Sequence, residues 1–361
     1  MKKIYLVGGA VRDKLLKIDY EEKDYVVIGS SPDEMVNEGF IPVGKDFPVF
    51  INPKDNNEYA LARTERKSGV GYKGFVFYTG KEVTLEEDLK RRDLTINAIA
   101  QDDEGNLFDP FNGIADIKNK TFRHVSEAFL EDPLRLIRLA RFSAKFPDFK
   151  IDSKTKILLE SIVLSGELLN ISADRMFKEI KKTFRYKKII KFFEILDSLN
   201  ALNQVFDVDE KFNIKLLGNF LENSNQDNIS FNIFWLFFER KFGCFLKNKV
   251  NFSKKDIVNI EKFFEIKNLN ALSLCDHPDK IDDLLNKISF YQDFYNLELF
   301  CKLFKLDDPN NTEKVDKIHS IALKLEKLLK NNKPNVDGIK NIEEIKEKIR
   351  IHRVKLIQKL I

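Results

Sequence analysis

Two short apolar segments near the start of the chain enclose a glycine pair, and this pattern constrains the fold more than any other stretch. Residues 4–7 are predicted to form a β-strand that runs into Gly8 and Gly9. Neither glycine carries a Cβ atom, so a bound ligand can approach the backbone closely there. Arg12 follows on the expected first turn of a helix, where free N–H groups attract anions. The pattern predicts a phosphate-binding turn.

A pair of carboxylates precedes the next predicted strand, residues 25–28. Glu22 and Asp24 lie two positions apart, so an extended backbone directs both side chains to the same side. Two carboxylates beside a phosphate site would suit Mg²⁺-assisted chemistry on a nucleotide. Taken alone, the glycine pair is more simply explained as a tight turn, and the acidic pair as solvated surface side chains. The combination is what favours a site.

Composition limits the class of protein. The chain has 361 residues, of which 43% are hydrophobic, and this is enough for two or three domains with packed cores. Its 61 basic and 57 acidic side chains nearly cancel, which leaves a net charge of +4. Any nucleic-acid binding therefore has to come from local basic surface.

Cysteine use and hydropathy predict a cytoplasmic protein without a membrane partner. Cys244, Cys275 and Cys301 are too widely spaced for a metal site and odd in number for a disulfide framework. The basic, apolar start resembles a signal peptide, but we interpret it as the first strand because the apolar run is short and ends at Arg12 and Asp13. No apolar window approaches the roughly 18 to 20 residues that cross a bilayer.

Glycine and proline divide the chain into two parts. Eleven of the 15 glycines and seven of the 10 prolines lie in residues 1–150, where short apolar segments alternate with turn signals. This part predicts a mixed β-sheet with helices. From about residue 130 onward the apolar spacing becomes helical. The expected fold class is therefore α+β, with a mixed-sheet domain followed by an all-α region.

Residues 58–78 contain a candidate third carboxylate and a basic loop. Glu58 begins a predicted strand and is placed to face the same cleft as Glu22 and Asp24. The loop over residues 64–75 mixes three basic residues with three glycines, a composition suited to closing over polyphosphate or RNA. An ordinary exposed hairpin tip explains the same composition equally well.

The segment LEEDLKRRDLTINAIA, residues 85–100, is predicted to be helical and to carry Arg92 and Asn97. A buried pair of Arg92 with Asp93 would be costly unless it binds or braces something. We interpret the pair either as part of the site or as a structural clamp. The turn DPFNG, residues 109–113, is expected to brace the same cleft.

A helix predicted over residues 131–142 carries a candidate for base recognition. Asp132 is expected at its N-cap and Pro133 at the first helical position. Asp132 and Arg135 would then be surface neighbours. A carboxylate accepts from an exocyclic amino group and a guanidinium donates to a ring nitrogen or carbonyl, so this pair is suited to the Watson–Crick edge of cytosine or adenine. Arg138 and Arg141 continue along the adjoining faces, and a solvated helix face is the plainer alternative.

A second helix, expected to begin with Ser172 at its N-cap, has a lysine-rich exterior. RNA backbone contact and an ordinary solvated surface both fit this pattern. Its basic residues are Lys178, Lys181, Lys182, Arg185, Lys187 and Lys188. Beyond residue 190 the chain remains helical without a motif, and no histidine is followed by the aspartate of a His-Asp phosphohydrolase.

Six segments stand in the order and approximate spacing of one enzyme family. They are GGAVRD (8–13), the acidic pair at 22–24, RRDLTINA (91–98), DPFNG (109–113), EDPLRLIR (131–138) and SADRMFKE (172–179). Over residues 1–185 the chain resembles the bacterial tRNA nucleotidyltransferases, and within them the class II CCA-adding enzymes of the polymerase-β-like superfamily.

The resemblance implies a nucleotidyltransferase head (1–128), a helical neck that recognises the base (129–190), and a helical body and tail that bind the tRNA acceptor arm (191–361). It implies that the RNA 3′-hydroxyl attacks the α-phosphate of CTP or ATP, without a nucleic-acid template and with release of pyrophosphate. Glu22 and Asp24 would bind Mg²⁺, with Glu58 as a further catalytic carboxylate. The nucleotide-binding residues would be Gly8, Gly9, Arg12, Arg92, Asp93, Asn97, Asp132, Arg135, Arg138 and Arg141.

Three alternatives stay open at this point. The nearest is a bacterial poly(A) polymerase, which has a second basic residue where VGKDF (43–47) has Asp46. A relative that adds only CC or only A fits the same motifs. A catalytically weakened RNA-binding protein is the alternative of another class, because Glu22 stands where the family has an aspartate. Its extra methylene shifts a Mg²⁺ ligand by more than about 1 Å.

Overall fold

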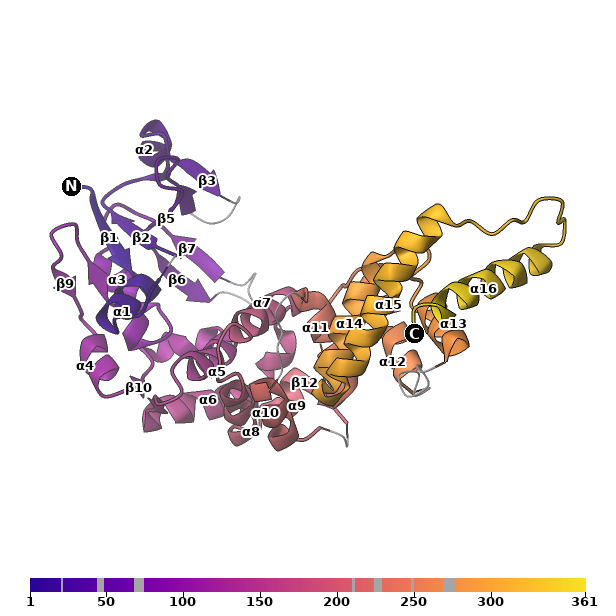
Figure 1. The fold of residues 1–361 in the computed structure, drawn as a ribbon. Helices are drawn as coiled ribbons and strands as arrows, with labels where there is room; N and C mark the ends of the chain where they lie inside the picture. The colour runs from indigo at the N-terminus through magenta and orange to yellow at the C-terminus, as the bar shows by residue number, and fades with distance from the viewer. Residues whose placement is uncertain are drawn as a thin grey trace. The chain divides into compact units, whose positions relative to one another are not determined.

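The structure is a computed structural model that describes residues 1–20, 22–43, 49–67, 75–209, 212–223, 229–247, 250–268 and 277–361 (Figure 1). The chain forms two compact units. The first comprises Met1–Glu222 and Phe245–Val250, and the second Asn223–Cys244 and Asn251–Ile361. The expected limits between head, neck and body stay a prediction, because the first unit contains residues of all three.

A seven-stranded mixed sheet forms the N-terminal part of the first unit. Its strand order is β3-β4-β5-β2-β1-β8-β9, and only the β2–β5 pair is parallel among these neighbours. The strands are β1 (Lys3–Val7), β2 (Asp24–Ile28), β3 (Ile41–Val43), β4 (Val49–Ile51), β5 (Glu58–Leu61), β8 (Ala100–Gln101) and β9 (Leu107–Phe108). The mixed sheet followed by helices confirms the expected α+β class.

The centre of the sheet is buried on both faces. Successive residues of a strand point to opposite sides, so neighbours on β2 enter different cores. Val26 belongs to the cluster that contains Val7 and Leu89, whereas Val27 packs with Met35 and Phe50. This double burial explains why β2 is a continuous apolar run rather than an alternating one.

Two short helices of the sheet domain, α2 and α3, begin at side-chain caps. Ser31 and Glu34 form a capping box at the start of α2, and Thr84 and Glu87 form another at α3. The remaining elements here are short. Their bounds are α1 (Gly9–Leu15), α2 (Pro32–Asn37), β6 (Thr64–Lys67), β7 (Phe75–Tyr78), α3 (Leu85–Lys90), η2 (Thr95–Asn97), α4 (Gly113–Lys118), β10 (Thr121–Phe122) and β11 (Lys150–Ile151).

The helix expected across residues 85–100 is wrong in its second half. α3 ends at Lys90, and the chain turns before η2 begins. The carboxylate of Asp93 accepts hydrogen bonds from the backbone N–H of Leu94 at 2.8 Å and from Nδ2 of Asn97 at 3.0 Å. Such local side-chain bonds compete with the backbone ladder and end the helix.

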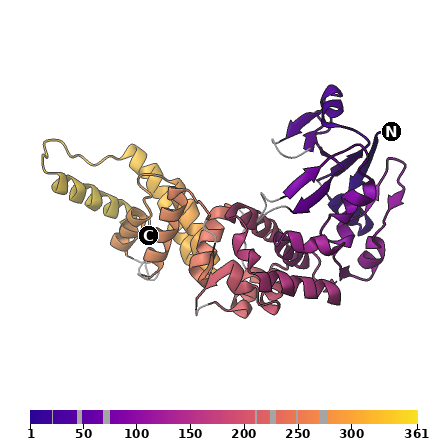
Figure 2. The ribbon, with the colours of Figure 1, turned by 180° about the vertical axis from the view of Figure 1, so that it is seen from behind.

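The helical part of the first unit is built around α5 (Leu134–Lys145). α5 packs against α7 (Ala173–Thr183) and α8 (Ile190–Ser198), and ten of its 12 residues are buried. It begins one residue later than expected, with Pro133 at the N-cap, whereas Ser172 caps α7 as expected. The other helices, seen also from behind in Figure 2, are η3 (Glu127–Glu131), α6 (Ser153–Ser165), η4 (Glu167–Asn170), α9 (Leu202–Val205) and α10 (Ile214–Asn223).

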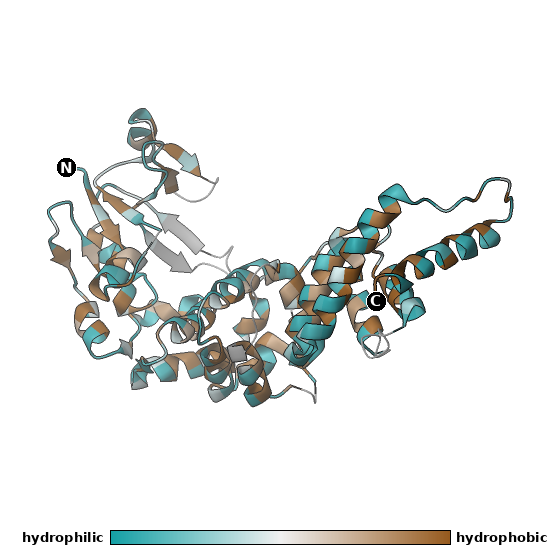
Figure 3. Ribbon diagram, in the orientation of Figure 1, coloured by the Kyte–Doolittle hydropathy of each residue, from teal (hydrophilic) through white to brown (hydrophobic). Residues whose placement is uncertain are grey.

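The second unit is a set of helices around an aromatic core. The ring of Phe263 lies 5.7 Å from that of Phe237 and 5.0 Å from that of Phe304, centroid to centroid. Hydrophilic and hydrophobic residues alternate along α15 and α16 (Figure 3). The elements are α11 (Phe231–Phe242), α12 (Lys254–Asn268), α13 (Pro278–Lys287), α14 (Tyr295–Asp307), η6 (Pro309–Asn311), α15 (Thr312–Asn331) and α16 (Ile342–Gln358). The strand β12 (Phe206–Val208) belongs to the first unit, and β13 (Cys244–Leu246) begins at the last residue of the second unit's first segment and continues in the first unit.

Within the described ranges, no helix combines the length and the apolar character needed to cross a membrane. In the part of the chain that the structure describes, Cys244 and Cys301 form no disulfide. Cys275 lies outside the described residues, so its expected lack of a partner stays a prediction.

Candidate active site

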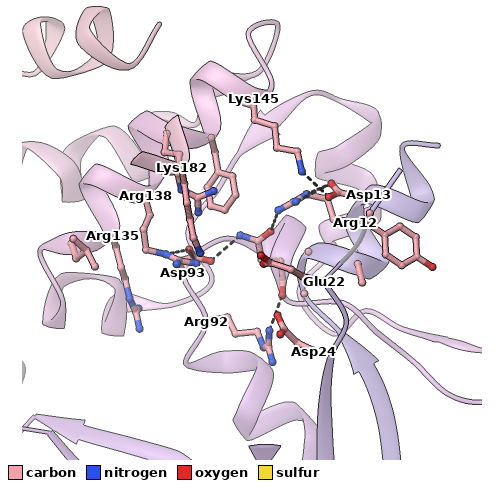
Figure 4. Close-up of a pocket in the computed structure, with 18 of the residues that line it drawn as sticks. Arg12, Asp13, Glu22, Asp24, Arg92, Asp93, Arg135, Arg138, Lys145 and Lys182 are labelled. Carbon is pink, nitrogen blue, oxygen red and sulfur yellow. Dashed lines mark hydrogen bonds and ion pairs between the residues drawn. The ribbon is translucent and has the colours of Figure 1, made fainter. Parts of the chain in front are cut away.

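A pocket of about 750 Å³ lies in the first unit, lined by residues of the sheet domain and of α5 and α7 (Figure 4). Its described lining contains eleven basic and six acidic side chains, so the field in the pocket favours a polyanion. The basic residues are Arg12, Arg63, Arg91, Arg92, Arg135, Arg138, Arg141, Lys145, Arg175, Lys182 and Arg185. The acidic residues are Asp13, Asp19, Glu22, Asp24, Asp93 and Asp132.

The pocket brings together every site residue expected from the sequence except Glu58. Glu58 is the register partner of Asp24 across the β2–β5 pair, so both side chains lie on the same face of the sheet. No group of three histidine, cysteine or acidic side chains close enough to hold a metal ion occurs among the residues that the structure describes. The role of Glu58 stays a prediction. The tip of the basic loop and Asp46 lie outside the described residues.

The glycine turn after β1 adopts a backbone conformation that requires glycine. Gly8 has a φ of +73°, which L side chains rarely adopt. A Cβ atom at this position would also lie 2.9 Å from Nη1 of Arg92. The absence of a side chain at Gly8 therefore allows the turn and also leaves room for Arg92.

Arg12 is buried against the wall of the pocket, with only 4% of its surface exposed. Its Nε donates to Asp13 at 2.9 Å, and its Nη1 donates to Oδ1 of Asn97 at 2.5 Å. The guanidinium lies over the rings of Phe142 and Phe146, 5.2 and 5.0 Å from their centroids. Burial lowers the pKa of Arg12, and the negative charge of Asp13 opposes this shift.

The two carboxylates at the start of the second strand line the pocket. Asp24 begins β2 and is paired with Val7, the last residue before the glycine turn. Burial raises the pKa of the Asp24 carboxyl, and the nearby charge of Arg92 opposes this while that of Glu22 adds to it. The register of β1 and β2 thus sets the carboxylates beside the turn.

Asp93 is the centre of a buried ionic network. Its Oδ2 accepts from Nε of Arg138 at 2.8 Å and forms an ion pair with Nη2 of the same arginine, also at 2.8 Å. Burial alone would raise the pKa of Asp93, but the charge of Arg138 and the hydrogen bond from Asn97 outweigh it and hold the pKa well below its usual range.

The expected Arg92–Asp93 pair is wrong, because Arg92 pairs with Asp88 at 3.3 Å. Adjacent residues at the turn point in different directions.

Glu179 of α7 extends this network to a second arginine of α5. It accepts from Nε of Arg141 at 2.5 Å and lies 3.6 Å from Nη1 of Arg138. Glu179 is 6% exposed and Arg141 is 7% exposed. The two arginines are therefore held in fixed orientations at the pocket by partners from both the turn after α3 and α7.

Asp132 and Arg135, the expected base-reading pair, both line the pocket but contact other groups of the protein. Oδ2 of Asp132 accepts from Nη2 of Arg175 at 2.8 Å. Arg135 donates to the backbone carbonyls of Ala128 at 2.9 Å and Arg91 at 2.6 Å. Base reading by this pair stays a prediction.

Several pocket residues were missed by sequence reasoning. Asp13 and Lys145 were not expected there, and Lys182 and Arg185 were considered only as RNA-binding surface. Lys145 follows Arg141 by four positions and Arg138 by seven, which is one helical face. That spacing is a signal that would have identified it.

Two family models match the chain. Residues 4–123 match the poly A polymerase head domain. Residues 148–209 match the family described as the probable RNA and SrmB-binding site of polymerase A. The first match covers the sheet domain, and the second begins at the C-terminal end of α5 and covers α6 to β12.

Similar proteins include curated CCA enzymes. The multifunctional CCA protein of Acinetobacter baylyi is 51% identical over 214 residues, 58% of this chain and 52% of that protein. The CCA-adding enzyme of Coxiella burnetii is 54% identical over 204 residues, 56% of this chain and 54% of that enzyme. The chain thus spans about half the length of the curated relatives it matches.

Solved structures extend the similarity of the fold to the C-terminal helices. The Bacillus stearothermophilus CCA-adding enzyme in complex with CTP has a TM-score of 0.69 at 20% identity, over 99% of this chain and 89% of that one. The Thermotoga maritima CCA-adding enzyme complexed with tRNA has a TM-score of 0.67 at 20% identity, over 99% and 90%. At such identities the similarity concerns the fold.

The sheet domain that holds the carboxylate pair matches a poly A polymerase head domain over residues 4–123. Over more than half of its length, the chain is similar in sequence to curated bacterial CCA-adding enzymes.

Proposed function

We propose that the protein is a CCA-adding tRNA nucleotidyltransferase, which adds CMP and AMP from CTP and ATP to the 3′ end of tRNA and releases pyrophosphate. The observation that carries this proposal is the pocket, in which Glu22 and Asp24 share one space with eleven basic side chains. Residues 1–128 would supply the reacting groups and residues 129–190 would recognise the base. Residues 191–361 would bind the acceptor arm.

The protein's part in such a reaction is to position groups and stabilise charge. The RNA 3′-hydroxyl attacks the α-phosphate, and the bond to the departing pyrophosphate breaks. Arg138 is oriented in advance by Asp93 and Glu179, and Arg141 is oriented by Glu179. Donors that are already aligned need little reorganisation when charge develops on the phosphates.

The carboxylate pair has the chemistry of a Mg²⁺ site. Glu22 and Asp24 offer hard oxygen ligands, and Mg²⁺ in nucleotide sites is usually held by one or two carboxylates, substrate phosphates and water. The pKa of Asp24 is raised by burial and by the charge of Glu22, and a bound cation would favour its ionised form. When bound, the ion would activate the attacking hydroxyl and stabilise the departing pyrophosphate.

Incubation with tRNA lacking its 3′-terminal CCA, Mg²⁺ and each labelled nucleotide tests the proposed function. We expect incorporation of CMP, then of AMP, and arrest after one A. Long A tails on arbitrary RNA would instead assign the protein to the poly(A) polymerases. Incorporation of only C or only A would make it a partial CCA-adding relative. Salt-sensitive tRNA binding without any incorporation would leave an RNA-binding protein.

Replacing Asp132 by alanine is expected to reduce the preference for CTP and ATP over UTP and GTP by roughly ten- to hundredfold. The variant loses the acceptor for the exocyclic amino group, and an unmatched buried polar group costs about 1–3 kcal/mol. Single-turnover incorporation of the four labelled nucleotides measures the preference. Asp148→Ala removes an exposed acid of the same unit and serves as the control. Unchanged selectivity in Asp132→Ala would exclude the edge-reading role.

A further inference from the structure

The helix after the glycine turn is tied to the helix of the expected base-reading pair by one buried carboxylate. Asp13 of α1 is 5% exposed. Its Oδ1 accepts from Nε of Arg12 at 2.9 Å and forms an ion pair with Nη2 of Arg12 at 2.8 Å. Its Oδ2 accepts from Nζ of Lys145, the last residue of α5, at 2.7 Å. Figure 4 shows Arg12 and Lys145 meeting at this carboxylate from two sides.

The contacts of Arg12 fix its guanidinium in one plane. Its Nε and Nη1 donate to Asp13 and Asn97, its Nη2 forms an ion pair with Asp13, and the rings of Phe142 and Phe146 lie under its face. The N–H groups that make none of these contacts have no protein hydrogen-bond partner among the described residues, and Arg12 lines the pocket. Their direction depends on how the Asp13 carboxylate is turned.

Lys145 determines how that carboxylate is turned. A carboxylate held by one partner can rotate about its bond to Cβ, whereas partners on both oxygens fix its plane. The side chains of Lys145 and Asp13 are 18% and 7% exposed, so water competes weakly for the bond. Lys145 also lies 5.3 Å from the centroid of the Phe146 ring, on which Arg12 packs.

We propose that Lys145 is a positioning residue of the nucleotide site: by holding the second oxygen of Asp13, it aims the remaining N–H groups of Arg12 at the phosphates of the incoming nucleotide. This inference rests on the proposed function. It assigns to α5 a second role besides carrying Arg135, because the same helix would align the phosphate end of the nucleotide through its C-terminal residue.

The proposal predicts a loss of nucleotide affinity that is the same for every base. Lys145 acts through Arg12 on phosphates, which CTP and ATP share. Lys145→Met should therefore raise the KM for CTP and for ATP by the same factor, about tenfold, which is below the roughly hundredfold loss that a 1 Å misplacement can cause. Selectivity against UTP and GTP should stay at the wild-type value. Lys145→Arg, which can still donate to Asp13, should recover most of the affinity.

The test measures kcat and KM for CTP on tRNA lacking CCA and for ATP on tRNA ending in CC, together with titration of each nucleotide without RNA. Lys120→Met is the matched control, because it breaks an exposed pair with Asp148 of the same unit that does not line the pocket. Asp13→Asn breaks the contact from the other side. Its effect and that of Lys145→Met should be non-additive, since both remove one interaction.

Several results would overturn the proposal. One is a KM within twofold of wild type in Lys145→Met, and another is a rise in KM for only one of the two nucleotides. A third is a KM in Lys145→Arg that is no lower than the KM in Lys145→Met. A purely structural role predicts a lower unfolding midpoint with unchanged KM values in the folded protein. If Lys145→Met does not fold, the same comparison is made with Asp13→Asn. Wild-type protein that binds and transfers neither nucleotide overturns the proposed function and this inference together.

Discussion

Replacing Asp24 by alanine is expected to abolish nucleotide transfer, with a fall in rate of more than about a hundredfold, while CTP binding stays within a few-fold of wild type. Asp24 is at the start of β2 in the pocket, where a metal ligand would have to align the attacking hydroxyl with the α-phosphate. Misplacement by about 1 Å can cost on the order of a hundredfold in rate. The arginines that we expect to contact the phosphates remain in the variant. Single-turnover transfer and CTP titration measure the two effects separately.

Variants of the neighbouring acids show which carboxylates act with Asp24. Glu22→Ala is expected to be nearly as severe, and Glu22→Asp decides whether the site is adjusted to the longer side chain. A rate that falls in Glu22→Asp indicates such an adjustment. Full activity in Glu22→Ala would remove Glu22 from the metal site and leave Asp24 with Glu58, its register partner on β5. Transfer at the wild-type rate in Asp24→Ala would contradict the proposed carboxylate pair itself.

Replacing Asp93 by asparagine is expected to lower the free energy of unfolding by about 3 kcal/mol at neutral pH and to impair transfer. Removing one partner of a buried ion pair typically costs roughly 3–5 kcal/mol, and the lower end applies because the Arg138 side chain is 34% exposed. Arg138 would keep the longer contact to Glu179 at 3.6 Å. Urea unfolding of the two proteins gives the difference in free energy.

The cost of the Asp93 substitution should depend on pH in one direction. The pKa of Asp93 is lower in the folded protein than the ordinary value of about 3.9, so its stabilisation is complete above that value and is lost as the pH falls through the folded pKa. The difference between wild type and Asp93→Asn should be constant from pH 7 to about 5 and shrink below about 4. Asp148→Asn, at an exposed pair with Lys120, should change stability by less than about 0.5 kcal/mol. A difference that grows in acid would contradict the assigned pKa shift.

The local elements of the first unit follow closely from the sequence. The strands at residues 4–7 and 25–28 appear as β1 and β2, and Ser172 caps α7. These features depend on neighbours along the chain, namely runs of β-branched residues, the preference of serine for the N-cap position and a glycine pair. The start of α5 was displaced by one residue because Pro133 takes the N-cap position instead of the first helical one.

The membership of the pocket was also largely predictable, whereas the contacts within it were not. Twelve of the thirteen residues expected from the motifs and the family resemblance line the pocket, but Asp93 was paired with the wrong arginine. Adjacency in sequence suggested Arg92, and the turn that ends α3 instead directs Asp93 toward α5. Helical periodicity cannot anticipate a turn that is stabilised by the side chain of Asp93 itself.

The sequence by itself determined the parts whose chemistry is local: the glycine turn, the acidic pair before β2, the caps, and the change from sheet to helices. The tertiary structure decided which charges meet. Arg138 reaches Asp93 across 45 residues, and Lys145 reaches Asp13 across 132. Periodicity tells which face of an element a side chain occupies, but an ion pair forms only where two faces pack, and burial then selects the partners because an unpaired buried charge is costly.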